Sequence, residues 1–209
     1  MVASLFCCAK HERGISYQMK LSIPLILASA SPRRKELLGQ IVDSFDVCVA
    51  NIIEEQQEFE TPEEYVARLA QQKAQAVAAN NPQFWVLGAD TIVVQNSQVF
   101  EKPKNQADFE RMMKLFSASS HQVLTAIALV KNEQIFQQTI ATTVTFRKLT
   151  NTEIESYWLS GEPQDKAGGY GIQGLAASFV EKINGNYGAV VGLPLCQTYQ
   201  LLSAAILEK

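Results

Sequence analysis

The residue with the clearest chemical potential in this chain is an aspartate inside an apolar segment. Asp90 stands within the run WVLGADTIVV, which predicts a buried strand. An ionised carboxylate in such a place is costly unless it is paired, protonated or bound to a metal ion. Gly88, two positions earlier, permits close backbone approach, which favours a ligand. The alternative is a structural aspartate satisfied by backbone donors, which would serve stability rather than catalysis.

A second candidate is the segment SASPRR, where one apolar run ends and a helix is expected to begin. Ser31 can cap that helix, and Pro32 fits its first turn. Arg33 and Arg34 then place two cations in the first turn, where the helix dipole disfavours them unless an anion binds. Unpaired amide groups with two guanidinium groups would suit a phosphate. Two solvated arginines on an exposed turn are the alternative.

The remaining charged candidates are weak singly and informative together. Lys73 is expected on the polar side of the second helix, Glu101 and Lys102 follow a strand, and Glu54 and Glu55 stand in a loop. Each alone is typical of a solvated surface charge. In combination, the acidic groups suit a divalent cation and the basic groups suit phosphates, because Mg²⁺ often binds through one or two carboxylates plus substrate phosphates.

Several familiar mechanisms have no support in the sequence. There is no G-x-S-x-G motif and no Walker loop. The match to G-x-G-x-x-G over 169–174 lacks the strand before it and the helix within it that dinucleotide binding requires. No C-x-x-C spacing occurs, so we expect no zinc site from the few thiols and imidazoles, which are Cys7, Cys8, Cys48, Cys196, His11 and His121.

Composition narrows the partners and the compartment. The formal charge of −3, from 18 Lys plus Arg and 21 Asp plus Glu, argues against a nucleic-acid polymer as partner. No run of 18 apolar residues occurs, so we expect no transmembrane helix and no membrane partner. Scattered cysteines with apolar neighbours fit a reducing cytosol, so the predicted location is cytoplasmic.

The predicted strands and helices that must position these residues alternate in the first part of the chain. In the middle of the chain, consecutive predicted strands form a meander. The pattern predicts an α/β fold with a mixed sheet and helices on its faces, as one two-lobed unit. Two capping boxes, TPEE at 61–64 and TNTE at 150–153, mark helix starts. The predicted strands cover 25–27, 45–49, 84–95, 99–100, 122–130, 135–146 and a strand-like run at 178–180; the predicted helices cover 33–41, 107–116, the segments after both boxes, and the chain from Pro194.

The first 18 residues are expected to be an extension of a single domain that covers 19–209. Their short apolar stretch is followed, not preceded, by charges, which is the reverse of a signal peptide. Met19 begins MKLSIPLILAS, which reads as a natural start directly before the first strand. Residues 1–18 are therefore either a loose extension or the product of a start codon placed too early.

Five ordered motifs resemble the Maf family of nucleotide pyrophosphatases, also called septum formation inhibitors. They are SASPRRKELL, GADTIV, EKP, DKAGGYGIQG and FVEKINGNYGAVVGLPL, and the resemblance runs from about Leu25 to the C-terminus. The double arginine, the threonine after GAD and the GIQG motif point to the branch that acts on dTTP and UTP. The resemblance implies a long twisted mixed sheet with a cleft between two lobes. It also implies hydrolysis of nucleoside triphosphates to the monophosphate and pyrophosphate, with Mg²⁺ or Mn²⁺ as cofactor.

The resemblance also assigns roles to residues. Asp90 matches the proposed proton acceptor, and the metal would be held among Asp90, Glu54, Glu55 and Glu101. Only one of the two loop glutamates belongs to the site, and the sequence leaves both eligible. The base-specificity positions match Arg33, Thr91 and Gln173, and the phosphate site matches Ser29, Arg34, Lys73 and Lys102.

Two other functions remain open at this point. One is a pyrophosphatase for a methylated or otherwise modified purine triphosphate, against which the three base-specificity positions argue. The other is a non-catalytic, nucleotide-binding regulator of septum formation, which would not need Asp90, Lys102 and the loop glutamates together. Homodimers occur in the family, but nothing in the sequence independently indicates one.

Overall fold

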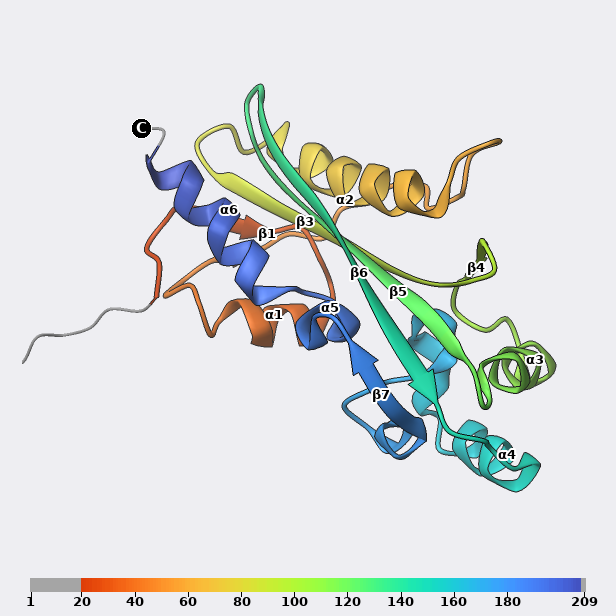
Figure 1. Ribbon diagram of the computed structural model, residues 1–209. Coiled ribbons are helices and arrows are strands. Elements are labelled where there is room, and N and C mark those ends of the chain that lie inside the picture. The colour runs from red at the N-terminus through yellow and green to blue at the C-terminus, as the bar shows by residue number, and fades with distance from the viewer. Residues whose placement is uncertain (1–19, 208–209) are drawn as a thin grey trace, which may run out of the picture.

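The computed structural model describes residues 20–207, so the expected extension over residues 1–18 lies outside the described residues. A seven-stranded mixed sheet forms the centre, in the order β2-β1-β3-β5-β6-β7 with β4 paired to β3 (Figure 1). β1 pairs in parallel with β2 and β3, and every other pairing is antiparallel. The expected mixed α/β sheet is confirmed. Its strands are β1 Leu25–Leu27, β2 Asp46–Val47, β3 Trp85–Gln95, β4 Gln98–Phe100, β5 Ser120–Lys131, β6 Gln134–Phe146 and β7 Val180–Asn184.

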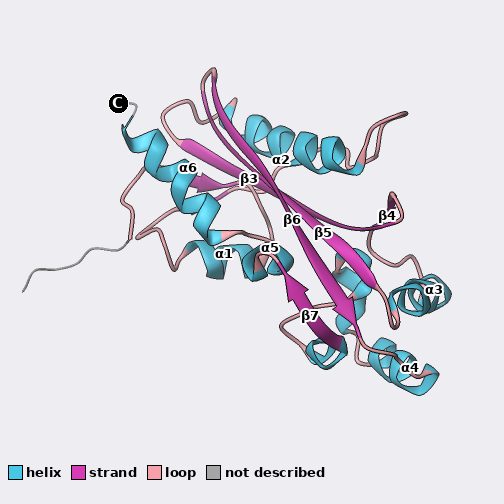
Figure 2. Ribbon diagram, in the orientation of Figure 1, coloured by secondary structure: helices cyan, strands magenta, loops and turns pink. Residues whose placement is uncertain are grey.

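The helices begin where the sequence predicts caps. The Ser31 hydroxyl accepts from the Arg34 amide, and both Thr61 and Thr150 form complete capping boxes with the glutamate three residues later. None of the helices in the described part of the chain is long and apolar enough to cross a membrane. The helices are α1 Pro32–Leu38, α2 Pro62–Ala78, α3 Gln106–Phe116, α4 Asn151–Leu159, α5 Tyr187–Val191 and α6 Leu195–Leu207, with 3₁₀ turns at Glu162–Asp165, Ala167–Gly169 and Leu175–Phe179 (Figure 2).

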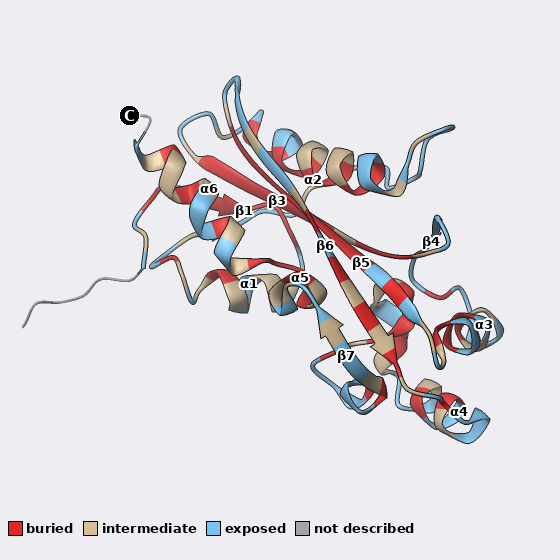
Figure 3. Cartoon of the chain, in the orientation of Figure 1, coloured by how far each residue is buried: buried red, intermediate tan, exposed pale blue. Residues whose placement is uncertain are grey.

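Three apolar clusters divide the molecule into two lobes. In the first lobe, one cluster fills the space between α2 and one face of the sheet, and the second lies on the opposite face under α1 and α6. The third cluster forms the second lobe, where α3 and α4 pack on the far ends of β3, β5 and β6. Figure 3 shows the buried residues continuing along β3 and β5 from one lobe into the other. The long strands therefore belong to both lobes.

Two elements near the C-terminus differ from the sequence-based expectation. The strand-like run at 178–180 is mostly a 3₁₀ turn, Leu175–Phe179, and strand β7 begins only at Val180. Helix α5 was not predicted, because it has five residues and contains a glycine. It is held by a local cap, in which the Asn186 side chain accepts from the Ala189 amide at 3.0 Å.

Candidate functional site

The cleft opens along a short free edge of β3. β1 pairs with residues 85–87 of β3, and β4 pairs with residues 93–95 on the same side. Between them, residues 88–92 face no strand on that edge. Asp90 and Thr91 are therefore accessible from the gap between β1 and β4. On its other edge, β3 pairs with β5 along residues 86–94. The carboxyl end of β1 and the start of α1 close the gap on one side, which is a common position for ligand sites in α/β sheets.

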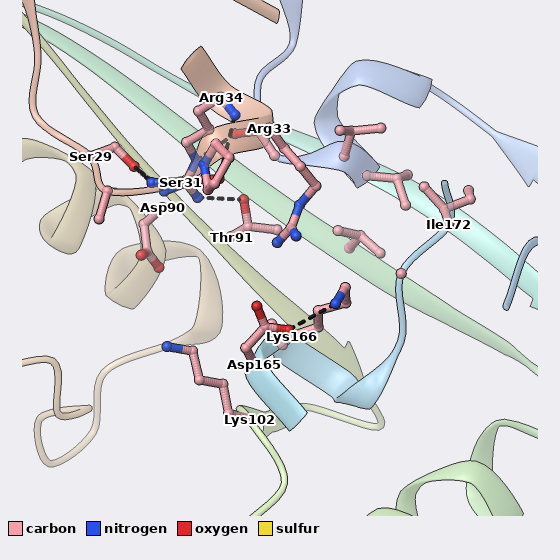
Figure 4. Close-up of a pocket in the computed structure, with 18 of the residues that line it drawn as sticks. Ser29, Ser31, Arg33, Arg34, Asp90, Thr91, Lys102, Asp165, Lys166 and Ile172 are labelled. Carbon is pink, nitrogen blue, oxygen red and sulfur yellow. Dashed lines mark hydrogen bonds and ion pairs between the residues drawn. The ribbon is translucent and has the colours of Figure 1, made fainter. Parts of the chain in front are cut away.

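The cleft has a volume of about 670 Å³ and brings together most of the residues expected in the site (Figure 4). Its lining mixes five cationic side chains with four carboxylates, so it is not a simple cationic pocket. Nine predicted residues line it: Ser29, Arg33, Arg34, Glu54, Lys73, Asp90, Thr91, Lys102 and Gln173.

Asp90 is paired with a buried lysine that also contacts a glutamate. Lys73 Nζ lies 2.6 Å from Asp90 Oδ1 and 2.9 Å from Glu54 Oε2. Asp90 and Lys73 are only 6% and 9% exposed, whereas half of the Glu54 side chain is exposed. One ammonium group thus compensates two carboxylates in a poorly solvated place. Within the described residues, Asp90 Oδ2 has no hydrogen-bond partner, so it remains available on the cleft side.

The expectation that Lys73 lies on the polar side of its helix was wrong. Lys73 is four residues from Leu69 and from Val77, so helical spacing places it on the buried face of α2. Gly88 brings that face unusually close to β3, because a Cβ at this position would lie 2.2 Å from the Ala70 carbonyl oxygen. The close packing turns Lys73 toward Asp90.

Arg34 is fixed by segments that are far apart in the sequence. Its Nε donates to the Gly192 carbonyl at 2.8 Å, Nη1 to Ser29 Oγ at 3.3 Å and Nη2 to Thr91 Oγ1 at 3.0 Å. Burial lowers the pKa of this guanidinium from its ordinary value, and the charge of Asp90 opposes that shift. A guanidinium group has five N–H donors, so two remain for a bound anion.

The Thr91 hydroxyl is used within the protein. Thr125 Oγ1 donates to the Ala189 carbonyl at 2.7 Å, so it accepts from Thr91 Oγ1, 3.0 Å away. Thr91 in turn accepts from Arg34. This chain of hydrogen bonds orients the Arg34 guanidinium. Thr91 therefore acts in the cleft by fixing the position of Arg34.

Three residues that line the cleft have side chains without internal partners. The side chains of Arg33, Lys102 and Gln173 form no hydrogen bond or ion pair with any other residue in the range 20–207. Figure 4 shows Lys102 reaching into the cleft from the side opposite Asp90. Groups that stay free in this way can bind a ligand without first breaking contacts within the protein.

Two of the expected carboxylates lie away from the cleft. Glu55 lines a separate surface groove beside Arg68 and Gln72, because successive residues of the extended loop point to opposite sides. Glu101 Oε1 accepts a hydrogen bond from Tyr65 at 2.9 Å and does not line the cleft. Of the two loop glutamates, Glu54 lines the cleft and Glu55 does not.

Other residues that line the cleft were not singled out from the sequence. Asp165, Lys166 and Tyr170 belong to the DKAGGYGIQG motif, so the motif itself was an available signal. Glu162 also lines the cleft, and nothing in its local sequence marks it. Asp165 and Lys166 form an ion pair of 2.8 Å, which lowers the pKa of Asp165.

The carboxylates offer a partial site for a divalent cation. Among the residues that the structure describes, no group of three or more His, Cys, Asp and Glu side chains is arranged so that it could hold a metal ion. Glu54 and Asp90 nevertheless converge on one cation already, the Lys73 ammonium. Two carboxylates completed by substrate phosphates are a common arrangement for Mg²⁺, so these residues fit such an ion.

Fold and cleft together define an α/β protein whose cleft gathers cationic side chains around a buried carboxylate. The model of the Maf family, described as "Maf-like protein", matches residues 24–205. The chain therefore belongs to the Maf family, as the motifs indicated.

Several curated relatives are similar along most of their length, and three proteins named dTTP/UTP pyrophosphatase illustrate this. The protein from Vibrio parahaemolyticus is 51% identical over 88% of this chain and 98% of its own. The protein from Shigella sonnei is 52% identical over 86% and 91%, and that from Vibrio vulnificus is 54% identical over 85% and 96%. Among solved structures, the Staphylococcus aureus Ham1 protein superposes with a TM-score of 0.41 at 11% identity, over 88% of this chain and 98% of that chain.

Proposed function

We propose that this protein hydrolyses dTTP and UTP to the nucleoside monophosphate and pyrophosphate. The observation that carries the proposal is the buried Asp90, with a free Oδ2, facing unpartnered cations in one cleft. The curated relatives of this chain, 51–54% identical, are named for this activity.

Triphosphate binding is assigned to the cations that the structure leaves free or partly free. Among the described residues, the side chains of Arg33 and Lys102 have no partner, and Arg34 keeps two N–H groups. Because Arg34 is already immobilised, it can orient a phosphate at little further cost in conformational entropy. Ser29, which is buried behind Arg34, supports that orientation.

Asp90 is proposed as the acceptor of the proton from the attacking water. Its Oδ1 is held by Lys73, so Oδ2 is the atom that takes the proton. Asp90 and Glu54 would also hold a divalent cation, Mg²⁺ or Mn²⁺, which when bound neutralises phosphate charge and lowers the pKa of the attacking water. Lys73 keeps the two carboxylates together when no ligand is present.

Base recognition is assigned to Gln173 and Arg33, which line the same cleft. A glutamine amide offers one acceptor and two donors, which match the N3–H and O4 of uracil or thymine. Arg33 offers donors alone and therefore favours a carbonyl-bearing edge. Thr91 is assigned an indirect role in base recognition, because its hydroxyl orients Arg34.

The test is a panel of nucleoside triphosphates with Mg²⁺, with Mn²⁺ and with a chelator. It should include dTTP, UTP, dCTP, dATP and a 7-methylated GTP, with chromatography of the products. We expect monophosphate and pyrophosphate in equal amounts, preference for dTTP and UTP, and loss of activity with the chelator. Orthophosphate as the product, or preference for the methylated purine, would contradict the proposal.

A further inference from the structure

The Gln173 side chain is carried by a tight turn at the edge of the cleft. The turn covers residues 171–174 and is closed by the Gly174 amide, which donates to the Gly171 carbonyl at 3.1 Å. Ile172 is buried and anchors the turn, whereas Gln173 is exposed and lines the cleft. The position of the Gln173 amide therefore depends on where this turn is held.

Two side chains from another segment hold both ends of the turn. The Gly171 amide donates to Tyr157 Oη at 3.0 Å, and the Leu175 amide donates to Glu162 Oε2 at 3.0 Å. Tyr157 Oη donates to Glu162 Oε1 at 2.8 Å and so joins the two supports. An ionised carboxylate only accepts, so Tyr157 must donate to Glu162 and accept from Gly171. The donor and the acceptor in each of these hydrogen bonds are therefore uniquely determined.

The glycines of the turn are explained by the same two supports. A Cβ on Gly174 would lie 2.3 Å from both carboxylate oxygens of Glu162. A Cβ on Gly171 would lie 2.7 Å from Lys166 Cε and 3.2 Å from Glu162 Oε1. Neither glycine has a positive φ, so neither is needed for backbone conformation. A Cβ at either position would force the Glu162 carboxylate or the Lys166 stem to move, so these glycines leave room for the side chains that border the turn.

We propose that Tyr157 and Glu162 are positioning residues for base recognition, which hold the 171–174 turn so that Gln173 meets the edge of a 4-oxopyrimidine. The inference rests on the proposed function, in which Gln173 reads the base. Recognition of the base by one amide tolerates only about 0.5 Å of error in the placement of that amide. Loosening of the turn therefore weakens discrimination between bases before it weakens hydrolysis of the triphosphate. Neither residue contacts the phosphates in this role.

The experiment compares kcat and KM for dTTP and dCTP in a set of single and double variants. Tyr157→Phe removes the hydroxyl that links the supports, and Glu162→Gln weakens the carboxylate without changing its length. Gln173→Ala is the reference, and Glu155→Gln is the matched control, since Glu155 is an exposed residue on the same helix as Tyr157. Thermal midpoints and circular dichroism verify that each variant is folded.

Both support variants should lose about tenfold of the preference for dTTP over dCTP, chiefly through KM for dTTP, with kcat changed less than threefold. Gln173→Ala should lose a similar amount, and Glu155→Gln should match the unmodified protein. The decisive variant is Tyr157→Phe combined with Gln173→Ala. If the supports act through Gln173, the double variant loses no more preference than Gln173→Ala alone.

The failures can be told apart. Support variants that keep the preference, while Gln173→Ala loses it, would overturn this inference and leave the proposed function standing. Losses that add in the double variant would mean that Tyr157 acts on stability or by another route, and would also overturn it. An unchanged preference in Gln173→Ala would remove the base-reading role of Gln173, and with it the premise of the inference.

Discussion

At the scale of single residues, Asp90 carries the strongest expectation. Asp90→Asn preserves shape and can still accept from Lys73, but it removes the charge and the basicity. We expect a folded protein that binds nucleotide, with turnover lower by roughly 10²–10⁴, the usual value of a general base. Thermal midpoint, nucleotide affinity and turnover should be measured on one preparation. If Asn lowered stability yet left turnover per folded molecule almost unchanged, Asp90 would be a structural residue.

Lys73 carries a second prediction, which concerns metal binding without nucleotide. Lys73→Met leaves Glu54 and Asp90 without their shared counter-ion, so their electrostatic demand for a cation rises. We expect Mn²⁺, followed by electron paramagnetic resonance, to bind at least about tenfold more tightly than to the unmodified protein.

The matched control is Lys102→Met, which removes a cationic side chain from the cleft without breaking an ion pair in the described structure. Its effect on Mn²⁺ affinity should be clearly smaller. Equal or weaker Mn²⁺ binding by Lys73→Met would show that the two carboxylates are not a cation site.

At the scale of elements, the packing of α2 against β3 sets the distance between Lys73 and Asp90. Gly88→Ala should separate the two elements, since the added Cβ would meet both the Ala70 carbonyl and the Ala74 amide. We expect a loss of about 1–3 kcal/mol in the free energy of unfolding, together with reduced turnover. Urea unfolding and steady-state kinetics measure the two effects.

Gly39→Ala is the control for that substitution. Gly39 ends α1 with an ordinary helical φ of −62°, and a Cβ there would lie no closer than 3.5 Å to its neighbours. It should change neither stability nor turnover appreciably. A Gly88→Ala protein as stable and active as Gly39→Ala would show that the close approach of α2 is unimportant.

The sequence predicted elements better than it predicted contacts between them. Serine and threonine caps are local signals, so the starts of α1, α2 and α4 could be identified correctly. The burial of Lys73 was also available from its helical spacing but was missed. Glu54 could not be separated from Glu55, because an extended loop gives no sign of which side faces the cleft. The link from Thr91 through Thr125 to Ala189 depends on tertiary packing alone.

At the scale of the whole molecule, His121 should make folding sensitive to acid. It is buried among aromatic rings, with Nε2 2.8 Å from Tyr170 Oη, and Nδ1 has no hydrogen-bond partner among residues 20–207. Burial lowers its pKa from 6.5 to about 4. The unfolded chain therefore takes up a proton below pH 6.5 that the folded protein does not take up until about pH 4, and stability falls across that interval.

Between pH 7 and pH 5 this difference amounts to about 2 kcal/mol. Urea unfolding at both values should be compared with the double variant His121→Phe, Tyr170→Phe, which removes both polar groups and leaves no unpaired hydroxyl. The double variant should lose less stability on acidification by that amount. An identical pH dependence in both proteins would show that His121 is not the responsible group.

The long antiparallel strands have a mechanical consequence. β5 and β6 pair without interruption from Ser120↔Thr145 to Lys131↔Gln134, and β3 follows β5 from Val86↔Val130 to Val94↔Gln122. Since these strands run through both lobes, the described part of the chain joins the lobes through paired strands and not through a single flexible segment. We therefore expect the back wall of the cleft to keep its width when a nucleotide enters or pyrophosphate leaves, and induced fit to be confined to side chains and to the loops at the rim.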